Sequence, residues 1–135
     1  MAGTVVADTL QADSTSTLVL KNGVANTPPT IQDSAGTQIG TFCRAWVNFN
    51  GTSASPITPR GSFNVSSVTK PSTGQYTVTF TVAMPDANYS TQVSTADSNR
   101  PGINSGATAS AVGVTTRNNA NTLTDLDPVT VAVFR

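Results

Sequence analysis

The sequence predicts an all-β protein: an antiparallel β-sandwich of about six to seven strands, preceded by an extended, β-hairpin-like N-terminal segment. Two observations lead to this prediction. The chain has no Glu and only two Lys, whereas Thr, Ser, Asn and Val dominate, so helix formers are scarce and residues typical of strands and turns are abundant. In addition, short runs of alternating apolar and polar residues recur along the chain, as expected for strands with one buried face.

The clearest strand covers residues 75–82. Its apolar side chains alternate with Gln75 and three threonines, and all of them are expected in the core: Tyr76, Val78, Phe80 and Val82. The alternation stops at Met84-Pro85-Asp86, because proline cannot donate to a strand ladder. A second alternating run starts at Tyr89 and continues to Thr95.

The strand predicted over residues 42–49 has aromatic side chains on both faces. Cys43, Ala45, Val47 and Phe49 share one face, and Phe42, Arg44, Trp46 and Asn48 share the other. Because both faces carry large apolar groups, we expect both to be covered, one of them by another subunit. Phe42, Arg44 and Trp46 are therefore the predicted subunit-interface residues.

Further elements follow the same reasoning. Phe63 and Val65 share one parity but Val68 does not, which predicts a bulge or a strand end. Residues 70–74 are predicted to form a hairpin loop, residues 96–107 a long polar loop, and residues 117–121 a tip loop between strands at 109–116 and 129–135. We predict that residues 41–135 form the sandwich domain.

Residues 1–40 carry few and small apolar side chains, separated by turn signals at Asn22-Gly23, Pro28-Pro29 and Asp33 to Gly36. At roughly 25 cal/mol per Å² of buried apolar area, such a segment is not expected to be stable alone. We therefore interpret residues 1–40 as an extended attachment and trimerisation segment that gains its order from a neighbouring copy or another protein.

The composition argues against several functions. Seven basic and seven acidic side chains balance without clustering, so we expect no nucleic-acid or membrane partner. No apolar run reaches the ~20 residues of a membrane helix, and no secretory signal is recognisable. Without His there is no Ser-His-Asp relay and no imidazole metal ligand. We expect no enzymatic activity, no metal and no cofactor.

Three weaker signals keep alternatives open. Asp125 and Asp127 could form a carboxylate pair for glycan cleavage or calcium, although a turn beside solvated groups is the favoured interpretation. Cys43 could be a nucleophile, but a small core residue is favoured. Trp46 and Tyr89 could stack on a sugar ring, with core or interface packing as the default.

Three segments resemble the short β-rich domains at the ends of bacteriophage tail and head fibres. They are RAWVNFNGT (residues 44–52), YTVTFTVAMPDANY (76–89) and VTVAVFR (129–135), and the lead-in GTVVADTLQ with TLVLKNG is similar to repeat-like segments of such proteins. The resemblance implies a non-enzymatic virion protein, assembled in the bacterial host cytoplasm as a homotrimer that contacts other virion proteins of the capsid or tail.

Long tail fibres carry a docking domain and a long shaft, which these 135 residues do not contain. We therefore expect a short fibre, a spike or a capsid decoration (cement) protein anchored through residues 1–40. The alternative is a tip domain that mediates host attachment by binding a receptor or surface glycan. Its predicted binding loops contain Asn99, Arg100, Asn104, Arg117, Asn118 and Asn119.

Overall fold

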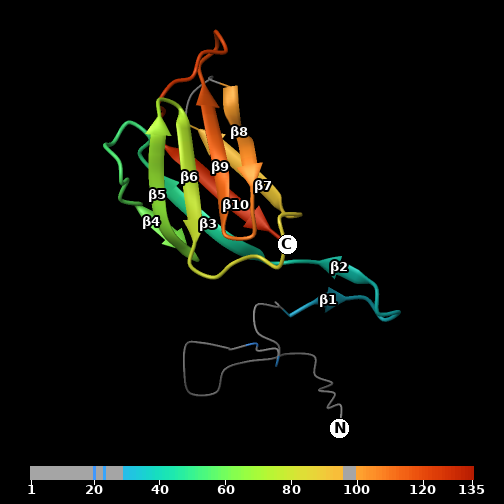
Figure 1. The fold of residues 1–135 in the computed structure, drawn as a ribbon. Coiled ribbons are helices and arrows are strands. Elements are labelled where there is room, and N and C mark those ends of the chain that lie inside the picture. Colours follow the sequence, from blue (N-terminus) through green and yellow to red (C-terminus); the bar gives the residue numbers. More distant parts are fainter. Residues whose placement is uncertain (1–19, 21–22, 24–28, 96–99) are drawn as a thin grey trace.

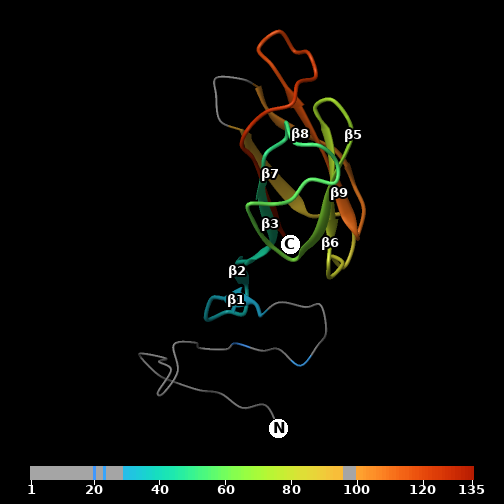
Figure 2. The ribbon, with the colours of Figure 1, turned by 90° about the vertical axis from the view of Figure 1, so that its left-hand side faces the viewer.

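The computed structural model describes residues 20, 23, 29–95 and 100–135, and these form two four-stranded antiparallel sheets and a small separate hairpin (Figure 1). The first sheet has the order β4 (Gly61–Phe63), β3 (Cys43–Phe49), β10 (Val129–Phe134), β7 (Ser90–Thr95). The second has the order β5 (Val65–Ser72), β6 (Gln75–Phe80), β9 (Ala111–Arg117), β8 (Arg100–Ala107). Figure 2 shows the two sheets as facing layers. The predicted all-β sandwich fold is confirmed.

The core lies between the two layers and comes from alternate positions of the strands, as a period of two requires. Its buried apolar side chains are Ala45, Val47, Phe49, Ile57, Val68, Tyr76, Val78, Phe80, Met84, Val112, Val114, Leu126, Val129, Val131 and Val133. The rings of Phe49 and Tyr76 meet edge to face with centroids 5.2 Å apart. This contact joins the first sheet to the second, because Phe49 belongs to β3 and Tyr76 to β6.

The sandwich has eight strands, which is more than the predicted six to seven. One reason is Asn64, which divides the predicted strand around residue 63 into β4 and β5 in different sheets. Asn64 has φ 55°, a left-handed conformation that asparagine tolerates better than most residues. The predicted irregularity near Val68 is confirmed as a register shift between Val65 and Ser67, after which Val68 is buried.

The second reason is β8, which corrects the prediction that residues 96–107 form one long loop. Residues 100–107 pair with β9 along the edge of the second sheet, with register irregularities between Arg100 and Ile103 and between Asn104 and Gly106. An edge strand tolerates proline and glycine, because its outer N–H groups need no ladder partner. Pro101 and Gly102 therefore did not end the strand, although they obscured it in the sequence.

Val82 was predicted to be a core residue, and that prediction was wrong. β6 ends at Phe80, and Val82 is 42 % exposed. The backbone N–H of Val82 donates to Oδ1 of Asn64 at 2.7 Å, and its carbonyl accepts from Nδ2 of Asn64 at 3.1 Å. Because these bonds replace those of a strand ladder, the alternation of buried and exposed side chains that includes Tyr76, Val78 and Phe80 does not extend to Val82.

The hairpin β1 (Ile31–Gln32) and β2 (Gln38–Gly40) lies beside one end of the sandwich (Figures 1 and 2). The turn predicted there is confirmed: Oδ1 of Asp33 accepts the N–H groups of Ala35 and Thr37, each at 2.9 Å. Gly36 completes the turn with φ +83°, which favours glycine. The predicted turn at Asn22-Gly23 lies partly outside the described residues, as do most of residues 1–28.

Candidate functional site

Large exposed apolar side chains are concentrated on the N-terminal segment and on nearby strands. Within the described ranges they are Leu20, Ile31, Ile39, Phe42, Trp46, Phe63 and Val82. The side chains described beyond residue 82, those of 83–95 and 106–135, add none. An exposed apolar patch is a common sign of an interaction site in a soluble protein. The asymmetry therefore marks this part of the molecule as the place to look for a partner.

Four of these side chains, together with Pro29, border one hollow of about 500 Å³, which we call the end hollow. It is lined by Leu20, Pro29, Phe42, Cys43, Arg44, Phe63, Asn64 and Val82. Phe42 immediately precedes β3, Phe63 ends β4, and Val82 follows β6. The hollow therefore forms where three strands of the sandwich begin or end and the N-terminal segment approaches.

Asn64 holds the strand ends of this hollow together. Its Nδ2 donates to the carbonyl of Arg44 at 3.0 Å and to that of Val82 at 3.1 Å, while its Oδ1 accepts the N–H of Val82. One amide thus connects the start of β3, the β4–β5 corner and the end of β6. This fixes the geometry of the exposed apolar side chains around it.

The three predicted interface residues lie in two places. Phe42 is 41 % exposed and borders the end hollow, together with the half-buried Arg44. Trp46 is 43 % exposed and stands on the outer face of the first sheet, where it pairs in register with Phe63. Ala45, Val47 and Phe49 are buried, as predicted for one face of β3. Coverage of the other face by a second subunit stays a prediction.

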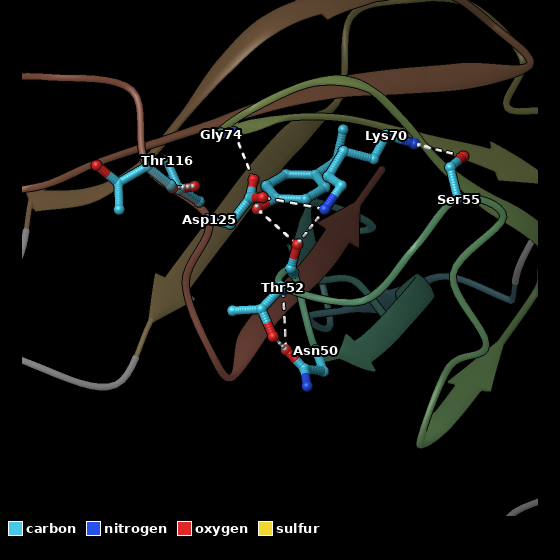
Figure 3. A network of polar contacts seen from close by, with 10 residues as sticks. Asn50, Thr52, Ser55, Lys70, Gly74, Thr116 and Asp125 are labelled. Carbon is cyan, nitrogen blue, oxygen red and sulfur yellow. Dashed lines mark hydrogen bonds and ion pairs between the residues drawn. The ribbon is translucent and has the colours of Figure 1, made fainter.

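A polar network secures the loops at the other end of the sandwich (Figure 3). The ammonium of Lys70 contacts Oδ2 of Asp125 at 3.0 Å and the carbonyl of Gly51 at 3.2 Å. Oδ1 of Asp125 accepts the N–H of Gly74 at 2.7 Å and the hydroxyl of Tyr76 at 3.1 Å. Gly51 admits no larger residue, because a Cβ there would lie 2.6 Å from the carbonyl oxygen of Leu126.

The network shifts the acid–base behaviour of its members. Desolvation, together with the nearby Asp125 charge, raises the pKa of Tyr76 to about 12. Desolvation acts to raise the pKa of Asp125 as well, but the bonds from Gly74, Lys70 and Tyr76 outweigh it and the pKa of Asp125 is lowered. Both groups therefore keep their ordinary forms, phenol and carboxylate, near neutral pH. The arrangement is that of a structural ion pair.

The two aspartates considered as a carboxylate pair have different partners. Asp125 pairs with Lys70, whereas Asp127 pairs with Arg60. Neither lies in a strand, because β10 begins at Val129, so the two carboxylates do not share a strand face, and the alternative of a catalytic or calcium-binding pair gains no support. Among the described residues there is no group of three Asp, Glu, Cys or His side chains that could hold a metal ion.

The predicted binding loops are only partly loops. Asn99 lies outside the described residues. Arg100 and Asn104 belong to β8, which corrects the loop prediction for both, and Arg100 is the register partner of Arg117 on β9. The structure thus brings Arg100 and Arg117 to the same end of the second sheet, while Asn104 pairs with Val114 within it.

Arg117, Asn118 and Asn119 do lie where β9 leads into the tip loop, at the opposite end from the β1–β2 hairpin (Figure 1). Nη1 of Arg117 donates to the carbonyl of Asn121 at 2.8 Å. Oδ1 of Asn118 accepts the N–H of Thr122 at 2.9 Å. Arg117 and Asn118 therefore stabilise the loop internally, whereas Asn119 is exposed.

Tyr89 and Cys43 also have structural contacts. The hydroxyl of Tyr89 donates to the carbonyls of Thr108 and Ala111 at 3.0 and 2.8 Å, and its ring packs edge to face on Phe80. Cys43 is half-buried and its Sγ lies 3.2 Å from the carbonyl of Ala45. Of the two aromatic residues considered for sugar stacking, only Trp46 presents an exposed ring.

A second hollow, of about 390 Å³, lies beside Trp46 on the outer face of the first sheet, and we call it the outer hollow. The side chains that line it were missed as a group in the sequence, because they come from three strands that are distant along the chain. Only Trp46 carried a signal there, as a large aromatic residue on the polar face of an amphipathic strand.

Two further observations complete the description. None of the described residues forms a helix long and apolar enough to cross a membrane. A comparison of the whole chain with protein-family models, with curated proteins and with solved structures found no match.

Proposed function

We propose that this protein is a non-enzymatic structural component of a bacteriophage particle. It acts as a short homotrimeric fibre, spike or capsid decoration protein, anchored by residues 1–40 with its sandwich directed away from the anchor. The proposed class of protein is supported by the resemblance of residues 44–52, 76–89 and 129–135 to phage fibre domains. The proposed trimerisation and anchoring are supported by the distribution of exposed apolar side chains.

The observation that carries the proposal is the end hollow. Phe42, Phe63 and Val82 are each more than 40 % exposed, and Leu20 of the N-terminal segment borders the same space. Burying these groups against another copy would gain roughly 25 cal/mol per Å² of apolar area. Because the N-terminal segment meets the sandwich at this hollow, trimerisation and anchoring would occur at the same end of the molecule.

The polar network at the opposite end fits a projecting domain. There, Asp125, Lys70 and Tyr76 tie the loops to the sheets, and none of the large exposed apolar side chains lies in the loop segments 50–60, 70–75 or 117–128. Such a surface remains soluble when it faces solvent. The two ends therefore suit two environments, one in contact with the particle and one outside it.

The first experiment measures oligomeric state. Light scattering after size-exclusion chromatography is expected to give a trimer for the wild-type chain and a smaller species for the double variant Phe63→Ser and Val82→Ser. Thr77→Ser with Thr79→Ser, on the outer face of the second sheet, is the matched control and is expected to remain trimeric. A wild-type chain that is monomeric at every concentration tested would contradict the trimer.

The second experiment measures incorporation into particles. Purified particles assembled in a bacterial host are expected to contain the full-length chain and to lack a variant without residues 1–40. Equal amounts of both in the particles would show that the anchor lies elsewhere. Absence of the full-length chain from particles would contradict the proposed function itself.

A further inference from the structure

The outer hollow is built from two rows of side chains that run across three strands of the first sheet. Register pairing aligns β3, β10 and β7 so that one row contains Trp46, Ala132 and Gln92, and the next contains Asn48, Thr130 and Ser94. All six residues line the hollow. They lie on the face opposite the core, because the intervening Val47, Val131 and Val93 point inward.

The depth of the hollow depends on small residues on both sides of the indole. Ala132 stands between Trp46 and Gln92 in its row and leaves the space between them open. On the other side, the indole reaches over Gly61 of β4, where a Cβ would lie 3.3 Å from Cη2 of Trp46. Glycine at 61 therefore lets the ring extend across the neighbouring strand, with 43 % of Trp46 exposed.

The chemistry of the lining is aromatic and neutral polar. Among the described residues that line the outer hollow, none is charged; the polar ones carry an amide or a hydroxyl. Oδ1 of Asn48 is buried and accepts no hydrogen bond from the part of the chain that the structure describes. The hydroxyl of Thr130 donates to the carbonyl of Ser94 at 3.3 Å, which leaves its lone pairs to accept.

This combination matches one class of ligand. A sugar ring has an apolar C–H face that packs on an aromatic ring, and hydroxyl groups around its edge that both donate and accept hydrogen bonds. Oδ1 of Asn48 is covered in the chain alone, so a sugar hydroxyl reaches it when the Asn48 side chain turns towards the hollow, and it then satisfies an acceptor that the described chain leaves unpaired. We propose that the outer hollow binds an uncharged oligosaccharide, with one sugar residue seated on Ala132 against Trp46.

In this site Gln92 and Asn48 act as the amide partners of the sugar hydroxyls. The hollow crosses β3, β10 and β7 and is open along the sheet face, so a chain of several sugar units can pass across it. The absence of charged groups among its described lining residues disfavours acidic glycans, because a carboxylate would lose hydration without gaining a cationic partner.

The proposal is compatible with assembly through the end hollow, since the end hollow and the outer hollow share none of their described lining residues. It requires that Trp46, one of the predicted subunit-interface residues, stays uncovered in the trimer. Trp46 is the only tryptophan in the chain, so the fluorescence of the full-length protein reports on this site directly. Neutral hexasaccharides of glucose, galactose, mannose, rhamnose or N-acetylglucosamine serve as probes, with a galacturonic acid hexasaccharide as the acidic comparison.

We expect at least one neutral probe to change the Trp46 emission saturably, and the acidic probe to leave it unchanged. Calorimetric titration then compares variants, because Trp46→Ala removes the fluorophore. Trp46→Ala is expected to abolish binding, and Trp46→Phe to retain part of it. Gln92→Ala and Asn48→Ala are each expected to weaken binding about 3- to 10-fold, as the loss of one hydrogen bond predicts. Thr77→Ala, on the second sheet, is expected to bind like the wild type.

Each other outcome overturns the proposal. Binding that persists in a folded Trp46→Ala variant would place the sugar site elsewhere. Absence of binding to every neutral probe, or a preference for the acidic one, would refute the proposed ligand class. Emission that changes with protein concentration alone, together with loss of the trimer in Trp46→Ala, would identify this face as a subunit interface. Thermal unfolding of each variant verifies that it is folded.

Discussion

Asp125 is a loop residue whose carboxylate binds groups from distant parts of the chain. Its carboxylate contacts Lys70, which is 55 residues away along the chain, and Gly74, which is 51 residues away. No local pattern in the sequence encodes such partners, and the favoured interpretation of this segment was a turn beside solvated groups. Although both carboxylates belong to the segment between β9 and β10, Asp125 pairs with Lys70 of β5 and Asp127 with Arg60, which immediately precedes β4.

Residue patterns did predict the exposed aromatic group of the candidate site. Parity placed Trp46 on the face of its strand opposite Ala45, Val47 and Phe49, where a covering subunit was expected, and in the single chain that face leaves Trp46 43 % exposed. The same rule failed for Val82, because parity holds only while the strand continues. Where a strand ends depends on distant partners, here the side chain of Asn64.

Both tyrosines are predicted to titrate abnormally in the folded protein. Desolvation raises the pKa of Tyr76 to about 12 and also raises that of Tyr89. Because the folded pKa of Tyr76 exceeds the unfolded value of about 10, the associated stability is fully present below about pH 10 and is lost as pH rises towards 12. Tyr89 contributes in the same direction. Absorbance at the phenolate band should therefore remain low through about pH 10.

The control for this titration is the chain unfolded in urea, in which both phenols should ionise near their ordinary pKa of about 10. Tyr76→Phe and Tyr89→Phe assign the two contributions. A folded chain whose titration curve coincides with that of the urea-unfolded chain would contradict the buried, hydrogen-bonded positions of both rings.

At the scale of elements, alternation was a good guide to central strands and a poor one to edges. β6 and β10 were evident because each buries every second side chain. β8 was not, since an edge strand can carry proline, glycine and register irregularities without losing its single partner. The division of one predicted strand into β4 and β5 escaped prediction because it depends on the conformation of Asn64.

Asn64 is predicted to stabilise the corner between the two sheets in two separable ways. Its side chain makes bonds to Arg44 and Val82, and its backbone adopts φ 55°. Asn64→Gly keeps the backbone conformation accessible but removes the side-chain bonds, whereas Asn64→Ala loses both. We expect Asn64→Gly to reduce the free energy of unfolding by about 1–3 kcal/mol, and Asn64→Ala to reduce it by about 1 kcal/mol more.

Urea unfolding of the two variants measures these differences. Ser66→Ala is a suitable comparison at the same corner, because it removes a hydroxyl that donates to the carbonyl of Thr79 at 3.2 Å without a left-handed backbone. Equal stability of Asn64→Gly and the wild type would show that the amide contributes nothing to the corner.

At the scale of the whole molecule, composition indicated an all-β protein, and the period-two patterns and their spacing indicated a sandwich. The two kinds of evidence agree over most of the chain. The hollows were beyond prediction. Each depends on which side chains meet across strands, and on small residues such as Gly61 and Ala132 whose effect is visible only when their neighbours are placed. The site therefore required the structure, whereas the fold class did not.

The sandwich is predicted to fold without residues 1–40. Among the residues that the structure describes, every buried apolar residue of the core lies between Ala45 and Val133, so none of the described residues before 41 contributes a side chain to the core. The β1–β2 hairpin exposes Ile31 and Ile39 rather than burying them. A chain of residues 41–135 should therefore unfold cooperatively, with a midpoint temperature within a few degrees of that of the full-length protein.

Calorimetry at matched concentrations of protomer makes the comparison, because trimer formation would stabilise the full-length chain by mass action. Residues 1–40 could affect the midpoint through the fold of the protomer or through trimer formation. To separate these two effects, the double variant Phe63→Ser and Val82→Ser is measured with and without residues 1–40. If the end hollow is the trimer interface, the truncation should have little effect on the midpoint in this background. Loss of cooperative unfolding on truncation would instead mean that residues 1–40 complete the fold, and the anchoring segment and the sandwich would then be a single structural unit.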